Sequence, residues 1–215
     1  MNSTNALWKI VTAQCVKSLA QRLRISKAAA FIVRGVKMII GLSGYAQAGK
    51  DTVAQILVED FGYTRLAFAD IIKKACYSLD PIINLDGMRL AHAVDKYGWD
   101  NTKALPEVRR LLQTMGSEVG RDLIDPQIWV ELTMHNIHPD DKVVLSDVRF
   151  RNEAEEIKWR HGQIWRISRI EKGAPINIHR SETDMDSWDF DQYISNNGTI
   201  EELALTVSEI LWKKK

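Results

Sequence analysis

The sequence predicts an α/β fold in which helices cover both faces of a parallel sheet. Short apolar runs of strand length alternate along the chain with segments whose apolar residues recur at helical spacing. The runs at 38–43 and 143–146 are mostly apolar on consecutive positions, as expected for parallel strands that are buried on both faces. We therefore expect a three-layer sandwich of helix, sheet and helix.

The expected elements follow one another with few interruptions. We expect strands at residues 38–43, 63–68, 143–146, 163–168 and 193–195, and helices at residues 53–57 onward, 71–79, 105–119, 152–160 and 200–212. The middle of the chain, about residues 87–138, reads as mostly helical. Its clearest helix has Pro106 near the start and Gly116 and Gly120 near the end. Thr199 is expected to cap the last helix, with Glu202 as its capping-box partner.

The charge distribution separates the first 37 residues from the rest. Residues 1–37 carry seven basic residues and no acidic residue, whereas the remaining 178 residues carry 22 basic and 28 acidic residues. A domain with a net charge of −6 is not expected to hold nucleic acid by charge alone. We expect a domain at residues 38–215. Residues 1–37 are then a basic helical extension, either accessory or a start-site artefact with Met38 as the natural start, rather than a binding arm.

The composition excludes several classes of protein. The 215 residues, 45% hydrophobic and 27% charged, suit one domain. Cys15 and Cys76 give neither a disulfide framework nor zinc spacing, which fits a reducing compartment such as the cytoplasm. No apolar run reaches the roughly 18 residues of a membrane span. His135 and His138 lack a Glu or Cys in register and are read as surface residues, not metal ligands.

The segment GYAQAGKDT, residues 44–52, which we call the glycine loop, matches G-x-x-x-x-G-K. It follows an expected strand and precedes an expected helix, which favours a phosphate-binding loop over a turn that happens to contain Gly and Lys. Backbone N–H groups and the helix N-terminus would surround phosphate oxygens, and Lys50 would reach the β- and γ-phosphates. The candidate ATP-binding residues are Gly44, Ala46, Ala48, Gly49, Lys50, Asp51 and Thr52.

Two carboxylates are candidate magnesium ligands. Asp147 ends an apolar strand, where ligands of open α/β sheets bind, and an acid there holds Mg²⁺ directly or through water. Asp51 stands where the motif has Ser or Thr, and its carboxylate is a hard oxygen ligand. The alternatives are a surface Asp147–Arg149 turn and an Asp51 that only caps its helix.

Phosphoryl transfer also needs cations on the migrating group and on the acceptor phosphate. Arg149 lies two residues after Asp147 and would face the same phosphates. Asp70, followed by Lys73, would orient the acceptor or cap a helix. The other candidate cations are Arg109 or Arg110, Arg121, Arg166 and Arg169.

Five segments occur in a fixed order: GYAQAGKDT at 44–52, LAFADIIK at 66–73, RLLQTMGSEVGR at 110–121, SDVRFRNE at 146–153 and HRSE at 179–182. Together they resemble the bacteriophage deoxynucleoside monophosphate kinases, relatives of the P-loop nucleoside and nucleotide kinases. The likeness runs from about residue 38 to 211. It implies a P-loop fold with a parallel five-stranded sheet, a helical region at about 87–138 that binds the nucleoside monophosphate, and a mobile lid at about 169–190.

The resemblance also implies the reaction. The γ-phosphate of ATP would move to the 5′-phosphate of a deoxynucleotide, with Mg²⁺, and give a diphosphate. By similarity, Arg121 and the Arg109/Arg110 pair would hold the monophosphate, and Arg169 would be a lid arginine. The expected catalytic residues are Lys50, Asp147, Arg149 and Arg169. Loops that end in GKDT are typical of this group, so Asp51 is no defect by that comparison.

Two other functions stay open at this point. One is a different small-molecule P-loop kinase, acting on dephospho-coenzyme A or phosphomevalonate. The other is a nucleic-acid-linked ATPase, against which the acidic core and the absence of a helicase-like second domain argue. For the leading interpretation we expect a deoxynucleotide partner, no stable nucleic-acid partner, no membrane, a monomer or homodimer, and a cytoplasmic location, in the host cell if the protein is phage-encoded.

Overall fold

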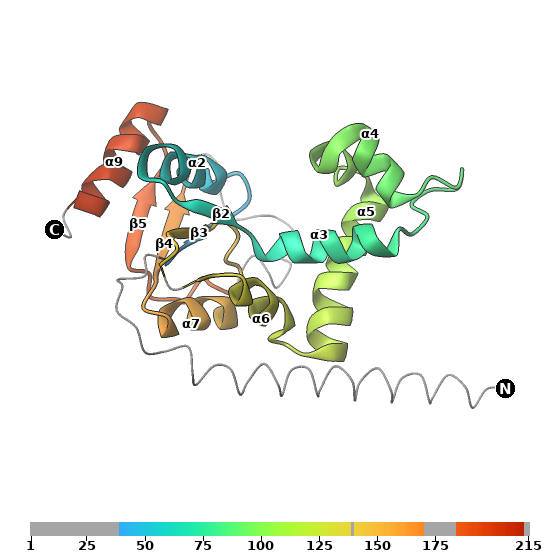
Figure 1. Ribbon diagram of the computed structural model, residues 1–215. Helices are drawn as coiled ribbons and strands as arrows, with labels where there is room; N and C mark the ends of the chain where they lie inside the picture. Colours follow the sequence, from blue (N-terminus) through green and yellow to red (C-terminus); the bar gives the residue numbers. More distant parts are fainter. Residues whose placement is uncertain (1–38, 139, 170–183, 213–215) are drawn as a thin grey trace.

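The computed structural model describes residues 39–138, 140–169 and 184–212 (Figure 1). The predicted extension at 1–37, the HRSE segment at 179–182 and most of the predicted lid lie outside the described residues.

A five-stranded sheet with the order β2-β3-β1-β4-β5 forms the centre of the fold. All four strand pairs are parallel, as predicted. The strands are β1 (Ile39–Ser43), β2 (Thr64–Leu66), β3 (Val143–Leu145), β4 (Gln163–Ser168) and β5 (Gln192–Ser195). The strand predicted at 63–68 is shorter than expected, because Phe68 already begins the next helix.

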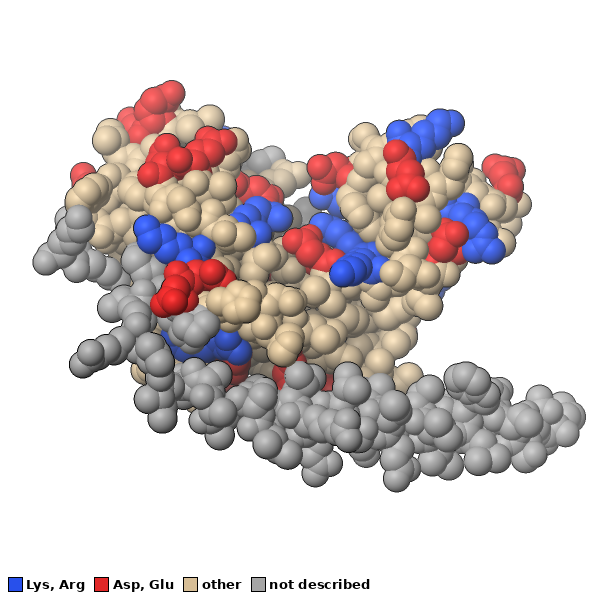
Figure 2. Space-filling view, viewed as in Figure 1, with Lys and Arg blue, Asp and Glu red and all other residues tan. Residues whose placement is uncertain are grey.

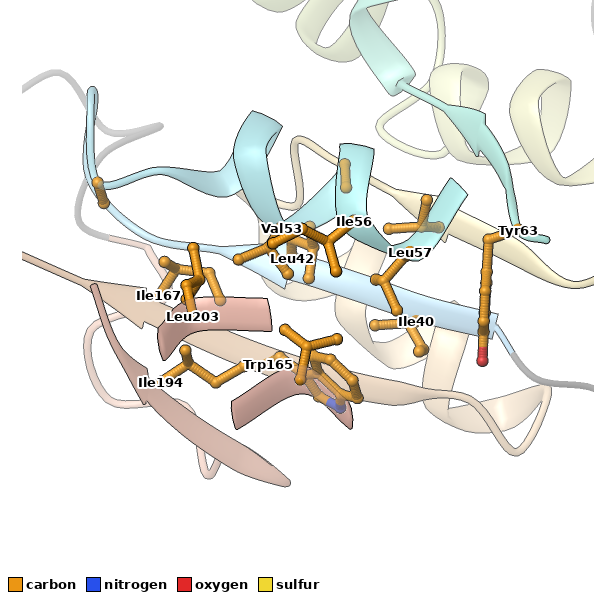
Figure 3. Close-up of a cluster of buried hydrophobic side chains, with 14 residues drawn as sticks. Ile40, Leu42, Val53, Ile56, Leu57, Tyr63, Trp165, Ile167, Ile194 and Leu203 are labelled. Carbon is orange, nitrogen blue, oxygen red and sulfur yellow. The ribbon is translucent and has the colours of Figure 1, made fainter. Parts of the chain in front are cut away.

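The strands send alternate side chains to two separate cores. Ile40 and Leu42 of β1 pack with α2 (Lys50–Phe61) and α9 (Ile200–Trp212) on one face, and Figure 3 shows this cluster. Ile39 packs on the other face, where α6 (Ile128–His135) and α7 (Arg151–Trp159) lie. Figure 1 shows the resulting helix, sheet and helix layers. The three-layer prediction is therefore confirmed.

Gly41 lets α7 approach the centre of the sheet closely. A Cβ atom at this position would lie 2.8 Å from side-chain atoms of both Ile157 and Val148. The two neighbours of Gly41 in β1 are also buried. Because Gly41 has no side chain, the Ile157 side chain of α7 fills the space beside the strand.

A helical region stands beside the sheet and has a core of its own (Figure 1). It consists of α3 (Phe68–Leu79), α4 (Leu90–Thr102) and α5 (Pro106–Thr114), and α5 continues without a break into the π-helix η1 (Met115–Ile124). Its fully enclosed residues are Cys76, Ile83, Leu90, Ala93 and Val108. The prediction of a mostly helical middle is confirmed.

Gly116 and Gly120 do not end the helix, which corrects the sequence-based expectation. Both lie inside η1 and are buried. Trp129 donates its indole N–H to the Gly116 carbonyl at 2.8 Å, and a Cβ at Gly120 would lie 2.4 Å from the same indole nitrogen. The glycines therefore make room for Trp129 of α6, and its indole satisfies a carbonyl in a stretch of π-helix.

The remaining helix predictions hold to within a few residues. Helix α7 was expected at 152–160, and α9 was expected at its observed position. Thr199 and Glu202 form the predicted capping box, since each side chain accepts the other's backbone N–H, at 3.3 and 2.9 Å. None of the helices within the described ranges combines the length and the apolar character that crossing a bilayer needs.

Candidate active site

The glycine loop lies between β1 and α2, as predicted, so it sits at the carboxyl end of the central strand of the sheet. Gly49 is the N-cap of α2 with φ +100°, and Gly44 has φ +148°. A Cβ at Gly44 would lie 2.3 Å from the Ile167 carbonyl oxygen. Both glycines are therefore required by the path of the backbone.

Lys50 holds its ammonium group against the glycine loop. Its Nζ donates to the carbonyl oxygens of Gly44 at 2.6 Å and Tyr45 at 2.8 Å. The cation thus stays within the loop that the sequence assigns to phosphates, rather than extending into solvent.

Asn196 supports the glycine loop from the end of β5. Its Nδ2 donates to the Ala48 carbonyl at 3.0 Å, and its backbone N–H donates to the Ser168 carbonyl at 2.7 Å. A Cβ at Gly49 would lie 2.1 Å from Asn196 Nδ2. The sequence analysis did not identify this role of Asn196, because no local pattern links it to the loop.

Tyr45 and Arg166 share Asp186 as a partner. The Tyr45 hydroxyl donates to Asp186 Oδ1 at 2.9 Å, and Arg166 Nη2 donates to the same oxygen at 3.0 Å. The Arg166 guanidinium also lies 4.7 Å from the centre of the Tyr45 ring. Arg166, one of the candidate phosphate cations, is thus engaged in fixing Tyr45 of the glycine loop.

Asp147 joins the end of β3 to the start of α3. Its two carboxylate oxygens accept the backbone N–H groups of Phe68 at 2.8 Å and Ala69 at 2.9 Å. Burial raises the pKa of Asp147, while these two hydrogen bonds and Arg149 lower it. The N-cap residue of α3, Ala67, has no side chain that could accept a hydrogen bond. Asp147 therefore supplies the acceptors for the first backbone N–H groups of α3.

Asp70 is not the N-cap of α3, which corrects one of the alternatives drawn from the sequence. It lies in the first turn, and its carboxylate pairs with Lys73 at 3.1 Å and with Arg65 at 3.7 Å. Arg65 also reaches Asp51 at 3.7 Å. Arg65 on β2, a residue missed by sequence reasoning, thus lies between the first turns of α2 and α3.

The two predicted magnesium ligands differ in how well they fit the ion. The Asp51 side chain is 89% exposed at the start of α2, so its carboxylate is open to a hard cation. Each Asp147 oxygen already accepts a backbone N–H, so Asp147 suits an indirect contact through water. No group of three or more His, Cys, Asp or Glu gathers around a metal site in the part of the chain that the structure describes. Mg²⁺ commonly takes substrate phosphates and waters as further ligands.

A cavity of about 760 Å³ lies between the α5–η1 helix and the start of α7. Arg110 and Arg121 line it from the helix, and Phe150 and Asn152 line it from the other side. Of the alternative pair Arg109 or Arg110, the lining includes Arg110, which also pairs with Glu107 at 2.6 Å. Arg109 is exposed and is not among the residues that line this cavity.

Arg121 is fixed by several partners inside this cavity. Its Nη2 donates to Glu153 at 2.5 Å, and its guanidinium lies 4.1 Å from the centre of the Phe150 ring. Burial raises the pKa of Glu153 to about 7, although Arg121 acts in the opposite direction. Glu153 also accepts the backbone N–H of Arg149 at 2.7 Å and so shapes the turn after β3. Sequence reasoning quoted Glu153 only as part of a motif and missed it as a buried anion.

Residues 184–187 link this cavity to the glycine loop. Asp184 accepts the backbone N–H of Arg151 at 2.9 Å, and Ser187 bonds the Arg151 guanidinium, while Asp186 holds Tyr45 of the loop. This segment therefore contacts both the glycine loop, at Tyr45, and a residue that lines the cavity, Arg151. Arg149 and Arg169 are exposed, at the turn after β3 and at the end of β4.

Lys73 and Asp70 line a second hollow of about 380 Å³, together with Lys74, Tyr77 and Trp99. Figure 2 shows the surface hollowed between the sheet and the helical region, with Lys and Arg side chains on both sides. Four predicted substrate residues thus line two hollows, Asp70 and Lys73 in the smaller one and Arg110 and Arg121 in the larger one, and Arg109 lines neither.

A glycine loop on the central strand of a parallel sheet, beside a cavity lined by arginines, defines a P-loop kinase. Residues 77–207 match the model of the family described as deoxynucleotide monophosphate kinase, which is more than half of the chain. The chain belongs to this family.

Individual relatives agree with the family match. A protein of Acanthamoeba polyphaga mimivirus named "Putative deoxynucleotide monophosphate kinase" is 32% identical over 186 residues, covering 77% of this chain and 91% of that protein. The deoxynucleoside-5′-monophosphate kinase of Escherichia phage T5 is 25% identical over 181 residues, covering 57% and 72%. A shikimate kinase structure from Aquifex aeolicus covers 82% of this chain and 98% of its own, with 16% identity and a TM-score of 0.42, a likeness too weak to support an inference.

Proposed function

We propose that this protein transfers the γ-phosphate of ATP to the 5′-phosphate of a deoxynucleoside monophosphate, giving ADP and a deoxynucleoside diphosphate. The observation that supports the proposal is the junction of two features that carry positive side chains. The glycine loop holds Lys50 at its carbonyls, and residues 184–187 join this loop to a cavity lined by Arg110 and Arg121. Membership of the deoxynucleotide monophosphate kinase family supports the same reaction.

The donor phosphates belong on the glycine loop. Backbone N–H groups at the start of α2 favour anions, and Lys50 would exchange its two carbonyl partners for the β- and γ-phosphates. Mg²⁺, when bound with ATP, would neutralise charge on the phosphate oxygens, and Asp51 would hold it with Thr52 nearby, while Asp147 would act through water.

The acceptor phosphate belongs at the cavity. Arg110 and the remaining N–H groups of Arg121 would hold the monophosphate, because an arginine fork matches phosphate oxygens. Arg149 and Arg169 would place positive charge on the migrating phosphoryl group. An ionised phosphate oxygen needs no strong general base, so the work of the protein is to position the two nucleotides and balance their charge.

The proposal is tested by incubating the protein with ATP, Mg²⁺ and each of the four deoxynucleoside monophosphates, and by measuring the diphosphates that form. We expect diphosphate from at least one of them, and Lys50→Ala should lower kcat by about 10²- to 10³-fold, the usual cost of losing one such cationic or hydrogen-bonding contact. Lys142→Ala is the matched control, since Lys142 precedes β3 at the opposite end of the sheet.

Two outcomes would contradict the proposal. Formation of no diphosphate from any of the four substrates, with turnover of dephospho-coenzyme A or phosphomevalonate instead, would assign the chain to another small-molecule kinase reaction. ATP hydrolysis that DNA stimulates, without nucleotide phosphorylation, would favour a nucleic-acid-linked ATPase.

A further inference from the structure

The apolar strand β3 is followed directly by a serine, Ser146, whose side chain is buried. Only 2% of Ser146 is exposed, and its hydroxyl has no hydrogen-bond partner among residues 39–138, 140–169 and 184–212. A hydroxyl donates one hydrogen bond and accepts up to two. Burying it without a partner costs free energy, so an orphaned hydroxyl needs an explanation. A ligand that supplies the missing partner is one such explanation.

The register of the sheet shows which face Ser146 occupies. Strand β1 pairs with β3 through Gly41 and Leu145, so the next pair places Leu42 beside Ser146. The backbone N–H of Ser146 donates to the Leu66 carbonyl of β2 at 3.1 Å, so the ladder continues through this residue. Neighbouring residues in adjacent strands point to the same face of a sheet, and Leu42 belongs to the core that α2 covers. Ser146 therefore points toward α2.

The start of α2 lies on this same face. Val53 packs in one cluster with Leu42, and Figure 3 shows the two side chains together. The glycine loop leaves β1 at its carboxyl end and α2 begins at Lys50, so the start of α2 and the end of β3 share one edge of the sheet. The orphaned hydroxyl of Ser146 thus lies at the edge where Lys50 and Asp51 would receive ATP and its metal.

Asp147, the next residue, is already engaged elsewhere. Its two oxygens accept the backbone N–H groups of Phe68 and Ala69 at the start of α3. Of the two polar residues that end β3, Ser146 is the one whose polar atom lacks a partner within the described ranges. Mg²⁺ bound with a nucleotide keeps several water ligands, and such a water is a hydrogen-bond donor that suits a hydroxyl oxygen.

We propose that Ser146 positions the magnesium–ATP complex, because its hydroxyl oxygen accepts a hydrogen bond from a water ligand of Mg²⁺. This inference rests on the proposed function, since it concerns the metal that accompanies ATP. The hydroxyl is closed to solvent in the free protein, so the first turn of α2 must shift as the phosphates bind. That shift belongs to the step in which Lys50 exchanges its two carbonyl partners for phosphates.

The test compares ATP binding by the wild type and by Ser146→Ala, measured by calorimetry without an acceptor, in Mg²⁺ and in EDTA. In Mg²⁺, Ser146→Ala should raise the Kd for ATP by about 3- to 10-fold, the scale of one hydrogen bond. In EDTA the two proteins should bind ATP equally, because the lost partner is carried by the metal. Equal Kd values in Mg²⁺, or the same loss in EDTA, would overturn the inference.

Thermal unfolding without ligands is the second readout. Because the hydroxyl has no described partner in the free protein, Ser146→Ala should melt at the wild-type temperature or above it. A lower melting temperature would mean that the hydroxyl already has a partner before ATP binds, which contradicts the inference. A weaker magnesium-dependent affinity in a protein of unchanged stability does not come from general damage to the fold.

Thr133→Val is the matched control. Thr133 of α6 is 3% exposed, and its hydroxyl also lacks a partner in the described part of the chain. Helix α6 covers the opposite face of the sheet, and valine has nearly the shape of threonine. Thr133→Val therefore removes an orphaned hydroxyl far from the glycine loop, and it should leave the Kd for ATP in Mg²⁺ unchanged. A rise equal to that of Ser146→Ala would refute the specific role of Ser146.

Binding without an acceptor also separates this inference from the proposed function. A magnesium-specific loss of ATP affinity in Ser146→Ala would support the role of Ser146 even if no deoxynucleotide were phosphorylated. An unchanged affinity in a protein that does phosphorylate deoxynucleotides would overturn the role of Ser146 and leave the proposed function intact.

Discussion

Asp147→Asn tests whether the end of β3 holds the substrate helix in place. Both oxygens of Asp147 accept backbone N–H groups at the start of α3, from Phe68 and Ala69. Asparagine has almost the same shape, but it replaces one acceptor with an NH₂ group that would face a backbone N–H. One N–H at the helix terminus then loses its partner.

The expected loss of stability in Asp147→Asn comes from this lost hydrogen-bond acceptor rather than from the lost charge. Because burial already raises the pKa of Asp147, removing its charge also removes a desolvation cost. An unpaired buried N–H costs about 1–3 kcal/mol, and we expect the free energy of unfolding to fall by that amount in Asp147→Asn. The measurement is urea unfolding at pH 7, followed by tryptophan fluorescence.

Asp70→Asn is the control, since Asp70 lies in the first turn of the same helix and is 45% exposed. Its pairs with Lys73 and Arg65 are partly solvated, so this change should cost about 0–1 kcal/mol. Equal stability losses in the two variants would refute the anchoring role of Asp147. A Mg²⁺ titration of activity adds a second readout, because a rise in the half-saturating Mg²⁺ concentration in Asp147→Asn would show that the carboxylate also serves the metal.

Three further predictions concern Glu153, Asn196 and the helix glycines. With a folded pKa of about 7 and an ordinary unfolded value of 4.5, Glu153 stabilises the fold at low pH and loses that contribution as pH rises through 7. The free energy of unfolding of the wild type, minus that of Glu153→Gln, should therefore fall by about 1 kcal/mol from pH 6 to pH 8 in urea unfolding. A difference that stays constant with pH would contradict the shifted pKa. Asn196→Ala should raise the KM for ATP by about 3- to 10-fold, with little change in kcat, because one hydrogen bond to the glycine loop is lost; an unchanged KM would remove its supporting role. Gly120→Ala should cost about 1–3 kcal/mol in thermal unfolding, because its Cβ meets the Trp129 ring, and Gly116→Ala should cost less, since its Cβ meets only the end of the Ile72 side chain at 3.2 Å. Equal costs in the two glycine variants would show that Trp129 does not set the limit.

The layered fold could be predicted from the sequence because its signals are local. Strands β1 and β3 are short apolar runs, and α9 carries a capping box within four residues of chain. The length and path of the α5–η1 helix could not be read in the same way. A carbonyl of the π-helix accepts a hydrogen bond from Trp129 of α6, a partner that the sequence of the helix does not reveal.

The candidate site shows the same division. The glycine loop was visible because its residues are contiguous, and Asp147 was visible because it ends a strand. The partners of those residues come from distant segments: Asn196 follows β5, Arg65 lies on β2, and Phe68 begins α3. The choice between Arg109 and Arg110 needed the orientation of α5, because only the packed helix shows which residue faces the cavity.

The helical region has a core of its own, separate from the two cores on the sheet. None of its enclosed residues belongs to the sheet, and partly buried hydrophobic side chains such as Trp99 and Leu111 surround them. A region with a small core of its own can unfold locally at a lower free energy than the whole protein. Amide hydrogens of α4 should therefore exchange before those of β1. A monophosphate bound between Arg110 and Phe150 would link the helical region to α7 and add about 2.7 kcal/mol at a hundredfold excess over its Kd. The bound monophosphate would then stabilise the fold of the helical region. The amide hydrogens of this region would exchange most slowly in the substrate-bound state, which is the state that is ready to react.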